Sequence, residues 1–543
     1  MGNPRKHRQC CPVLSGESVP TKAMELRFPL KGVTRNSTLR ATPDMRGTWP
    51  SPWAVNCRAE DNIDRRLRGG SRPGVTKFVA DDMGAVIADI TSISVARTTG
   101  ASEILVVLVD STVKTVENGT TTTPVAYLTN AAGDTVQTAA GDDIVLSSAT
   151  APAAGFLVTG QQQVFAVTTS GVVKIDPKDG LLRNVVASGG TIPTNCTFGA
   201  VYRDRLCVSG ADNAIYMSAQ GDYADWNYGA HFENSGRAIV LQLSLSSDVG
   251  AAPTALMAHK DAYLLAASKR TLWVIHGDPG ADGVLRRVSE NVGVISSRAW
   301  CRIDDAFCFL AEDGIYSVNG DGSSLTPLSK TDVPDELRDV NTATTTVTMG
   351  YEHDKRAVHV FLRTSSGSDT HWVYEMAAQS WWPVRLPDAH SPLATCQHQG
   401  EMLLAGSDGY IRKIGGSDDD GTSIESHVAI GPLRLGTPNH FGRMKNLHAS
   451  LAAGGGTVQW RIVTGSTAEE AADNAKLAIE AFQAGASYAN YVKASGAWTA
   501  GRANMAYPRV RAVWACLWLQ STATWGYEGV VATAVRSGRW KGE

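Results

Sequence analysis

The stretch between positions 56 and 75 holds the densest group of side chains in this chain that could bind an anion. It reads NCRAEDNIDRRLRGGSRPGV and contains the arginines Arg58, Arg65, Arg66, Arg68 and Arg72. A guanidinium presents a rigid fork of N–H donors that fits a carboxylate or a phosphate in a two-point contact. The stretch therefore binds either a phosphate or carboxylates of the protein itself.

The glycines of this stretch do not complete a phosphate-binding loop. Gly69 and Gly74 have the spacing of the two glycines in such a loop, which requires Lys followed by Ser or Thr directly after the second glycine. Here Val75, Thr76 and Lys77 follow instead, and no apolar strand precedes the loop. The sequence therefore does not predict a nucleotide site.

Other residues with catalytic or ligating chemistry are scattered. The twelve histidines include no H-E-x-x-H and no tight group with metal spacing, and there is no G-x-S-x-G nucleophile elbow. Carboxylate pairs such as Asp304-Asp305 fall in expected turns, where solvated Asp is common. The fourteen tryptophans at strand spacing favour core or interface positions. We predict no active site, no metal and no cofactor, and expect that the chain is not an enzyme.

The elements that must position the arginines are mainly β. Seven units of a short apolar run, a polar turn and a second short run begin at Ile104, Val164, Leu206, Tyr263, Phe307, Val358 and Met402. Their spacing of roughly 40 to 60 residues is typical of propeller blades with insertions. Turns such as Glu312-Asp313-Gly314 supply the positive-φ residue of a tight hairpin. The pattern favours an irregular β-propeller of about six to eight blades over unrelated hairpins in a sandwich.

The two ends of the chain differ from this repeat. Residues 1–77 contain prolines at 29, 43, 50, 52 and 73 and predict an extended basic arm. Residues 78–420 form the predicted propeller, and 421–543 a C-terminal β-domain with one helix. That helix opens with a capping box from Thr467 to Glu470 and runs to about 484. We expect Gly69-Gly70 and Pro73-Gly74 to form a turn that delivers the arm to the first blade.

The charge is divided unevenly along the chain. Residues 1–77 carry 15 Lys and Arg against 6 Asp and Glu, net +9, whereas the remainder carries 35 against 47, net −12. Such an arm suits nucleic acid, a membrane surface or the acidic body of a neighbouring copy, and we favour the last.

Hydropathy and cysteine usage indicate a protein made in a cytoplasm. The longest apolar run, residues 104–109, fits a buried strand and is too short to span a bilayer. The first residues lack the apolar segment of a secretory signal. Nine scattered cysteines, with Cys10-Cys11 too close together for a zinc pair, predict reduced and mostly buried thiols.

The arginine stretch and the repeat together resemble a known family. The run Asn56-x-Arg58, then Arg65-Arg66-x-Arg68-Gly69-Gly70-Ser71-Arg72-Pro73-Gly74 before an irregular propeller, resembles the tail nozzle or hub proteins of tailed bacteriophages, a group that includes packaged-DNA stabilisation proteins. Phe28-Pro29-Leu30-x-Gly32 is similar to their openings, although some 23 additional residues precede Met24. Arg443-x-Lys445, Trp498-x-x-Gly501-Arg502 and Arg509-x-Arg511 are similar to their terminal β-domain.

This resemblance implies a virion structural protein. It implies a ring, expected to be hexameric, that continues the portal–adaptor channel, retains packaged DNA and lets it pass at ejection. The expected partners are other copies, portal–adaptor proteins, a tail fibre or needle, and DNA that passes without sequence-specific binding or membrane insertion. We expect the assembly interface to include Arg58, Arg65, Arg66, Arg68, Gly69, Gly70, Arg72, Pro73 and Gly74.

Two other functions remain open at the level of sequence. A propeller enzyme or adhesin acting on host surface polysaccharide would need an acidic cleft with aromatic walls at the propeller axis. A cellular propeller scaffold that binds peptides would be expected to carry WD or kelch signatures, which this sequence lacks.

Overall fold

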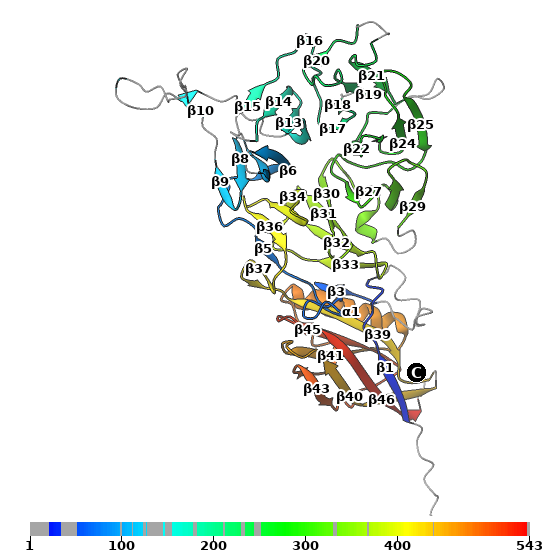
Figure 1. The fold of residues 1–543 in the computed structure, drawn as a ribbon. Helices are drawn as coiled ribbons and strands as arrows, with labels where there is room; N and C mark the ends of the chain where they lie inside the picture. The colour runs from blue at the N-terminus through cyan, green and yellow to red at the C-terminus, as the bar shows by residue number, and fades with distance from the viewer. Residues whose placement is uncertain are drawn as a thin grey trace, which may run out of the picture.

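The computed structural model describes residues 21–33, 51–97, 100–110, 112–122, 126–127, 139, 145–146, 155–177, 182–209, 212–229, 234–243, 251–328, 334–365, 369–437 and 439–539. The expectations for Cys10-Cys11, for most of the additional N-terminal residues, and for Pro43 and Pro50 lie outside these residues. The described chain forms a propeller and a β-sandwich at opposite ends of the molecule, with the arm strand β3 between them (Figure 1).

Within the described residues, seven antiparallel sheets form the propeller. The first three blades are β6 (Ile87–Arg97), β7 (Gly100–Val109), β8 (Thr112–Glu117), β9 (Thr120–Thr122); β12 (Phe156–Gly160), β13 (Gln163–Thr168), β14 (Gly171–Ile175), β15 (Leu182–Asn184); and β17 (Gly199–Tyr202), β18 (Arg205–Ser209), β19 (Ala214–Met217), β21 (Ile239–Gln242). The next three are β22 (Ala255–His259), β23 (Tyr263–Ala267), β24 (Leu272–His276), β25 (Val284–Ser289); β26 (Trp300–Ile303), β27 (Ala306–Ala311), β28 (Gly314–Asn319), β29 (Leu325–Pro327); and β30 (Thr345–Glu352), β31 (Ala357–Thr364), β32 (Thr370–Glu375), β33 (Ser380–Val384). The seventh contains β34 (Pro392–His398), β35 (Glu401–Gly406) and β36 (Ile411–Ile414).

The seven predicted hairpin units are the second and third strands of these seven blades, so the propeller prediction is confirmed. The predicted buried strand at residues 104–109 lies in β7. Strand β34 of the last blade contacts β6 of the first and closes the ring. Short elements lie between the blades: β10 (Ala126–Tyr127), β11 (Val145–Leu146), β16 (Gly189–Gly190) and the 3-10 turns Asp335–Leu337 and Asp388–His390. Strand β20 (Asp225–Trp226) lies within the third blade, and β37 (Asp418–Asp419) and β38 (Thr422–Ser423) follow the seventh.

The C-terminal part is a two-sheet sandwich covered on one side by a helix. One sheet has the order β2-β39-β45-β41-β42, the other β1-β46-β40-β43 with β44 beside β40. The strands are β39 (Ser426–Arg434), β40 (His440–Leu451), β41 (Val458–Gly465), β42 (Val492–Trp498), β43 (Gly501–Ala506), β44 (Arg511–Ala512), β45 (Trp514–Ser521) and β46 (Tyr527–Arg539). Helix α1 (Ala468–Gln483) begins at Thr467, whose hydroxyl accepts from the Glu470 amide at 3.0 Å, as the capping box predicts.

The N-terminal arm is built into both halves. Strands β1 (Thr21–Leu26) and β2 (Ala54–Val55) pair with β46 and β39 of the sandwich. Strands β3 (Cys57–Glu60) and β4 (Leu67–Ser71) form a hairpin, and β5 (Val75–Lys77) pairs with β36 of the seventh blade. The arm thus reaches the last blade before the chain enters the first, contrary to the expected direct delivery to the first blade. By adding β5, it covers a blade edge that would otherwise expose unpaired backbone groups.

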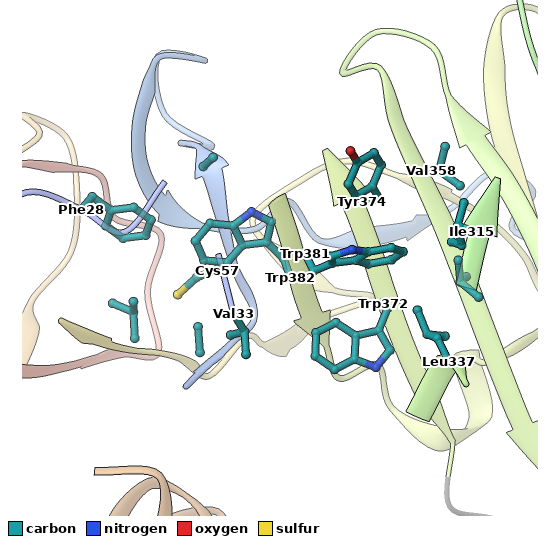
Figure 2. Close-up of a cluster of buried hydrophobic side chains, with 14 of the residues drawn as sticks. Phe28, Val33, Cys57, Ile315, Leu337, Val358, Trp372, Tyr374, Trp381 and Trp382 are labelled. Carbon is teal, nitrogen blue, oxygen red and sulfur yellow. The ribbon is translucent and has the colours of Figure 1, made fainter. Parts of the chain in front are cut away.

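One apolar core runs from the sandwich through the arm into the propeller. The ring of Phe28 lies 5.7 Å from that of Trp382 in the sixth blade and 5.7 Å from that of Tyr527 in the sandwich. Figure 2 shows Phe28, Cys57 and Val33 of the arm followed by Trp382, Trp381 and Trp372 of blade six. Because apolar contacts continue across the boundary, the two halves have little freedom to separate.

The described residues bear on the predictions for the cysteines and for membrane spans. All seven described cysteines are unpaired, and six are buried. No helix of the described chain combines the length and apolarity that a membrane span requires.

Candidate functional site: the arginine hairpin

The arginine stretch forms the β3–β4 hairpin between propeller and sandwich (Figure 1). Cys57 pairs with Ser71 and Arg58 with Gly70 in its register, so Arg58 and Arg72 lie at its base. Arg65 and Arg66 lie at its tip, before β4. The same residue type is therefore buried at one end of the hairpin and exposed at the other.

Arg72 is buried and has partners for its guanidinium on every side. Its terminal nitrogens donate to both carboxylate oxygens of Asp419, at 2.8 and 2.6 Å, and to the Arg385 and Pro73 carbonyls at 3.0 and 2.9 Å. Its Nε donates to Asn56 Oδ1 at 2.9 Å. A charge-assisted pair with this geometry fixes the arm to β37, which follows the seventh blade.

Arg58 enters a buried polar cluster in the sixth blade. Its guanidinium lies 3.4 Å from the half-buried carboxylate of Glu352 and 3.8 Å from the buried carboxylate of Glu375. Its Nε and one Nη have no hydrogen-bond partner within the described residues. Arg58 is thus held mainly by charge, with a looser geometry than Arg72.

The pKa values of the two carboxyl groups beside Arg58 are shifted in opposite directions. Burial alone raises the pKa of Glu352, but the Arg58 charge and the hydrogen bond from His359 outweigh it and lower that pKa to about 2. Burial dominates at Glu375 and raises its pKa to about 7 against the attraction of Arg58. The pair therefore shares one cation unequally.

A histidine pair completes this cluster. His359 Nε2 lies 3.0 Å from Glu352, and His359 Nδ1 lies 3.1 Å from His371 Nε2. Burial lowers the pKa of both imidazoles, so both are neutral near pH 7. Since an ionised carboxylate only accepts, His359 donates through Nε2 and its Nδ1 accepts from His371.

Arg68 joins the hairpin to the sandwich. It contacts Asp61 at 2.8 Å, Asp64 at 2.6 Å and Glu528 of β46 at 3.3 Å. Burial raises the pKa of Asp61, but amide hydrogen bonds and the Arg68 charge outweigh it, and the pKa is lowered. Arg65 and Arg66 are exposed and make no ion pair within the part of the chain that the structure describes.

The glycines of the stretch allow close packing rather than a turn. Gly69 and Gly70 lie in strand β4, contrary to the expected turn. A Cβ on Gly69 would lie 2.0 Å from the Phe28 ring, and one on Gly74 would lie 1.8 Å from the Asp418 carbonyl oxygen. Pro73 is buried between Arg72 and Gly74. The space at Gly69 and at Gly74 therefore admits no side chain larger than hydrogen.

A separate cavity of about 460 Å³ lies on the propeller axis, lined by the first strands of all seven blades. Asp89 is the one carboxylate among its described lining residues. It lies 2.9 Å from Arg298 and accepts from the Leu157 amide at 2.7 Å. Phe156 and Trp300 contribute aromatic walls. The described residues contain no group of three His, Cys, Asp or Glu side chains suited to a metal.

The sequence indicated the arginines but not their partners. Asp419 lies 347 residues from Arg72, and Glu352 lies 294 residues from Arg58. The available signal was a polar residue in an apolar strand: His359 stands among the apolar residues of β31 and is buried with them. The assembly role of the nine predicted residues stays a prediction.

Similarity of this chain to known proteins is found among solved structures, at low identity. No family model and no curated protein matches the chain. Among solved structures, it is similar to the WD40 β-propeller domain of Doa1 (13% identity, 63% of this chain, 96% of that chain, TM-score 0.35) and to the computationally designed Ika8 protein (14%, 63%, 100%, 0.34). It is also similar to the extracellular domain of a putative one-component system from B. thetaiotaomicron (10%, 70% of this chain, 43% of that chain, TM-score 0.40).

Proposed function

We propose that this chain is a structural protein of a bacteriophage virion that forms an oligomeric ring of the tail. The ring continues the portal–adaptor channel, retains packaged DNA and lets it pass at ejection. In this proposal the partners are other copies, portal–adaptor proteins, a fibre or needle, and DNA bound without sequence preference. The family resemblance of the arginine stretch motivates the proposal.

The observation that carries the proposal is the division of charge between the two halves. Residues 78–426, which include the propeller, carry 23 Lys and Arg against 41 Asp and Glu, net −18. Residues 427–543 carry 12 against 6, net +6, and the arm adds a further +9. Each phosphate that a cation neutralises adds salt-dependent affinity for DNA. An acidic propeller that faces a DNA channel would let the duplex slide.

The pairing of the arm with both halves supports a role in which the subunit resists mechanical force. Strands β1 and β2 join the sandwich, β5 joins the last blade, and Arg72 is paired between them. A subunit whose halves share strands and a core transmits force without hinging. That property suits a ring that holds back packaged DNA.

The test is the mass of the full-length protein in solution, alone and after mixing with a portal–adaptor complex, by light scattering with negative-stain imaging. The proposal predicts a ring near six subunits, formed alone or on the adaptor. A monomer that ignores the adaptor at every concentration would contradict it.

A second candidate function is binding of a surface glycan in the axial cavity. Its support is the cavity itself, with Phe156 and Trp300 as apolar walls and Asp89 as a polar group. Binding of host polysaccharide that is lost in the Trp300→Ala variant would favour this function. Unchanged binding in that variant would count against the cavity as the site.

A further inference from the structure

The sandwich sheet that contains β1 and β46 has an outer face that no described element covers. Its core face packs on the other sheet, and its outer residues alternate with the buried ones. Cross-strand register aligns the outer residues in two rows: Glu25, Val531, His448 and Met505 in one, and Val535, Arg443 and Arg511 in the other. Lys445 is exposed at a bulge between these rows.

This outer face is both cationic and apolar. Arg443 and Arg511 stand directly opposite each other, and like charges in that position weaken strand pairing. Neither Arg443 nor Lys445 makes an ion pair within the described residues. Met505 is 48% exposed and Val531 40% exposed. We name Arg443, Lys445, His448, Met505, Arg511 and Val531 the basic sheet face.

The opposite side of the sandwich carries the complementary chemistry. Helix α1 buries Ala471, Ala475 and Ile479 against the second sheet. Its outer side exposes Glu469, Asp473, Lys476, Leu477 and Glu480, which the helical repeat brings close to one line. Lys476 pairs with Glu480 at 3.8 Å, so Glu469 and Asp473 are the carboxylates of this line without a described ion pair. We name Glu469, Asp473, Leu477 and Glu480 the acidic helix stripe. The two sheets lie between the stripe and most of the basic sheet face, but Arg511 lines a cleft at the sandwich edge together with Glu470 and Asn474 of α1.

We propose that the basic sheet face of one copy binds the acidic helix stripe of the next copy. Cations then meet carboxylates, and the exposed Leu477 meets Met505 and Val531. Each copy uses both surfaces, so the contact is head to tail and forms a ring when the rotation from copy to copy closes. The inference deepens the proposed function, because it names one contact by which that ring is built.

The composition of the basic sheet face favours a protein partner over DNA. Arg, Met and aromatic residues are enriched in protein interfaces. Tyr507, 61% exposed, lies two residues beyond Met505 at the margin of the face. Phosphate contacts alone would not require Met505 and Val531 to be exposed on the same surface.

The experiment reverses charges in the full-length protein and measures assembly mass by light scattering over a concentration series, with and without the adaptor complex. The sheet variant is Arg443→Glu with Lys445→Glu, and the helix variant is Glu469→Lys with Asp473→Lys. A third protein combines all four changes. The matched control reverses two blade lysines, Lys114→Glu with Lys174→Glu, which lie on β8 and β14.

We expect the sheet and helix variants each to raise the concentration for half-assembly by about tenfold or more, because like charges then face each other. The combined variant should recover most of the wild-type assembly, and the control should not differ from wild type. Circular dichroism establishes that each variant is folded.

Three results would overturn the inference while the proposed ring survives. These are a wild-type ring that both single-surface variants also form, single-surface losses that the combined variant does not recover, and loss of binding to a short DNA duplex in the sheet variant with an intact ring. If the wild-type chain forms no ring under any condition, the proposed function itself fails.

Discussion

The base and the tip of the β3–β4 hairpin use the same residue type in opposite ways. At the base, Arg72 is buried against Asp419, and at the tip, Arg65 and Arg66 are exposed without a described ion pair. A cluster of arginines in sequence is therefore not one site. The base fixes the arm to the sixth blade and to β37, whereas the tip stays exposed.

Removal of the base arginine should have the largest effect. In Arg72→Ala, Asp419 keeps its charge in a buried position without a partner, so we expect the free energy of unfolding to fall by about 3–5 kcal/mol. Urea unfolding followed by tryptophan fluorescence measures the change. Arg72→Lys should recover only part of it, because an ammonium cannot reproduce the two-point contact. Stability equal to wild type in both variants would refute a structural role for the base.

The close approach at Gly74 should rank next. A Cβ there would lie 1.8 Å from the Asp418 carbonyl oxygen, so Gly74→Ala must displace backbone next to Arg72. We expect a loss of about 1–3 kcal/mol in the same unfolding measurement. Gly529→Ala is the matched control, since neither Gly74 nor Gly529 has a positive φ and a Cβ on Gly529 would meet no atom within 4 Å. Equal losses in the two variants would mean that backbone conformation, not the contact with Asp418, sets the effect.

Glu375, which lies 3.8 Å from Arg58, should make the free energy of unfolding depend on pH. Folding raises the pKa of Glu375 from 4.5 to about 7, so the folded state holds this proton more tightly. The contribution of Glu375 to stability is present below pH 4.5 and is lost as the pH rises through 7. We expect Glu375→Gln to gain about 2 kcal/mol relative to wild type between pH 5 and pH 8. A constant difference across that range would contradict the raised pKa.

Substitution at the tip should have the smallest effect on stability. Arg65→Ala with Arg66→Ala removes exposed side chains, so the free energy of unfolding should change by less than about 0.5 kcal/mol. If the tip serves assembly, the same variant should form the ring less well in light scattering. A ring of unchanged mass and concentration dependence would remove Arg65 and Arg66 from the interface.

The sequence predicted what local patterns determine. Seven hairpins followed from alternating apolar residues and turns such as Glu312-Asp313-Gly314, and α1 followed from its capping box. The outer strands of the blades carried too little signal, since β9 and β15 have three residues each.

The sequence did not predict which residues far apart along the chain pair with each other. Thr21 pairs with Val535, and the partners of Arg58 and Arg72 lie about 300 residues away, so only the folded chain brings them together. The arginines were therefore predictable as a cluster of anion-binding groups, but their division into a buried base and an exposed tip was not.

Scanning calorimetry of the full-length protein tests most directly whether the arm joins propeller and sandwich into one unit. The account predicts a single melting transition for wild type and a single transition at lower temperature for Arg72→Ala, because the shared core and the paired arm strands still join the halves. Two well-separated transitions already present in the wild-type protein would contradict it.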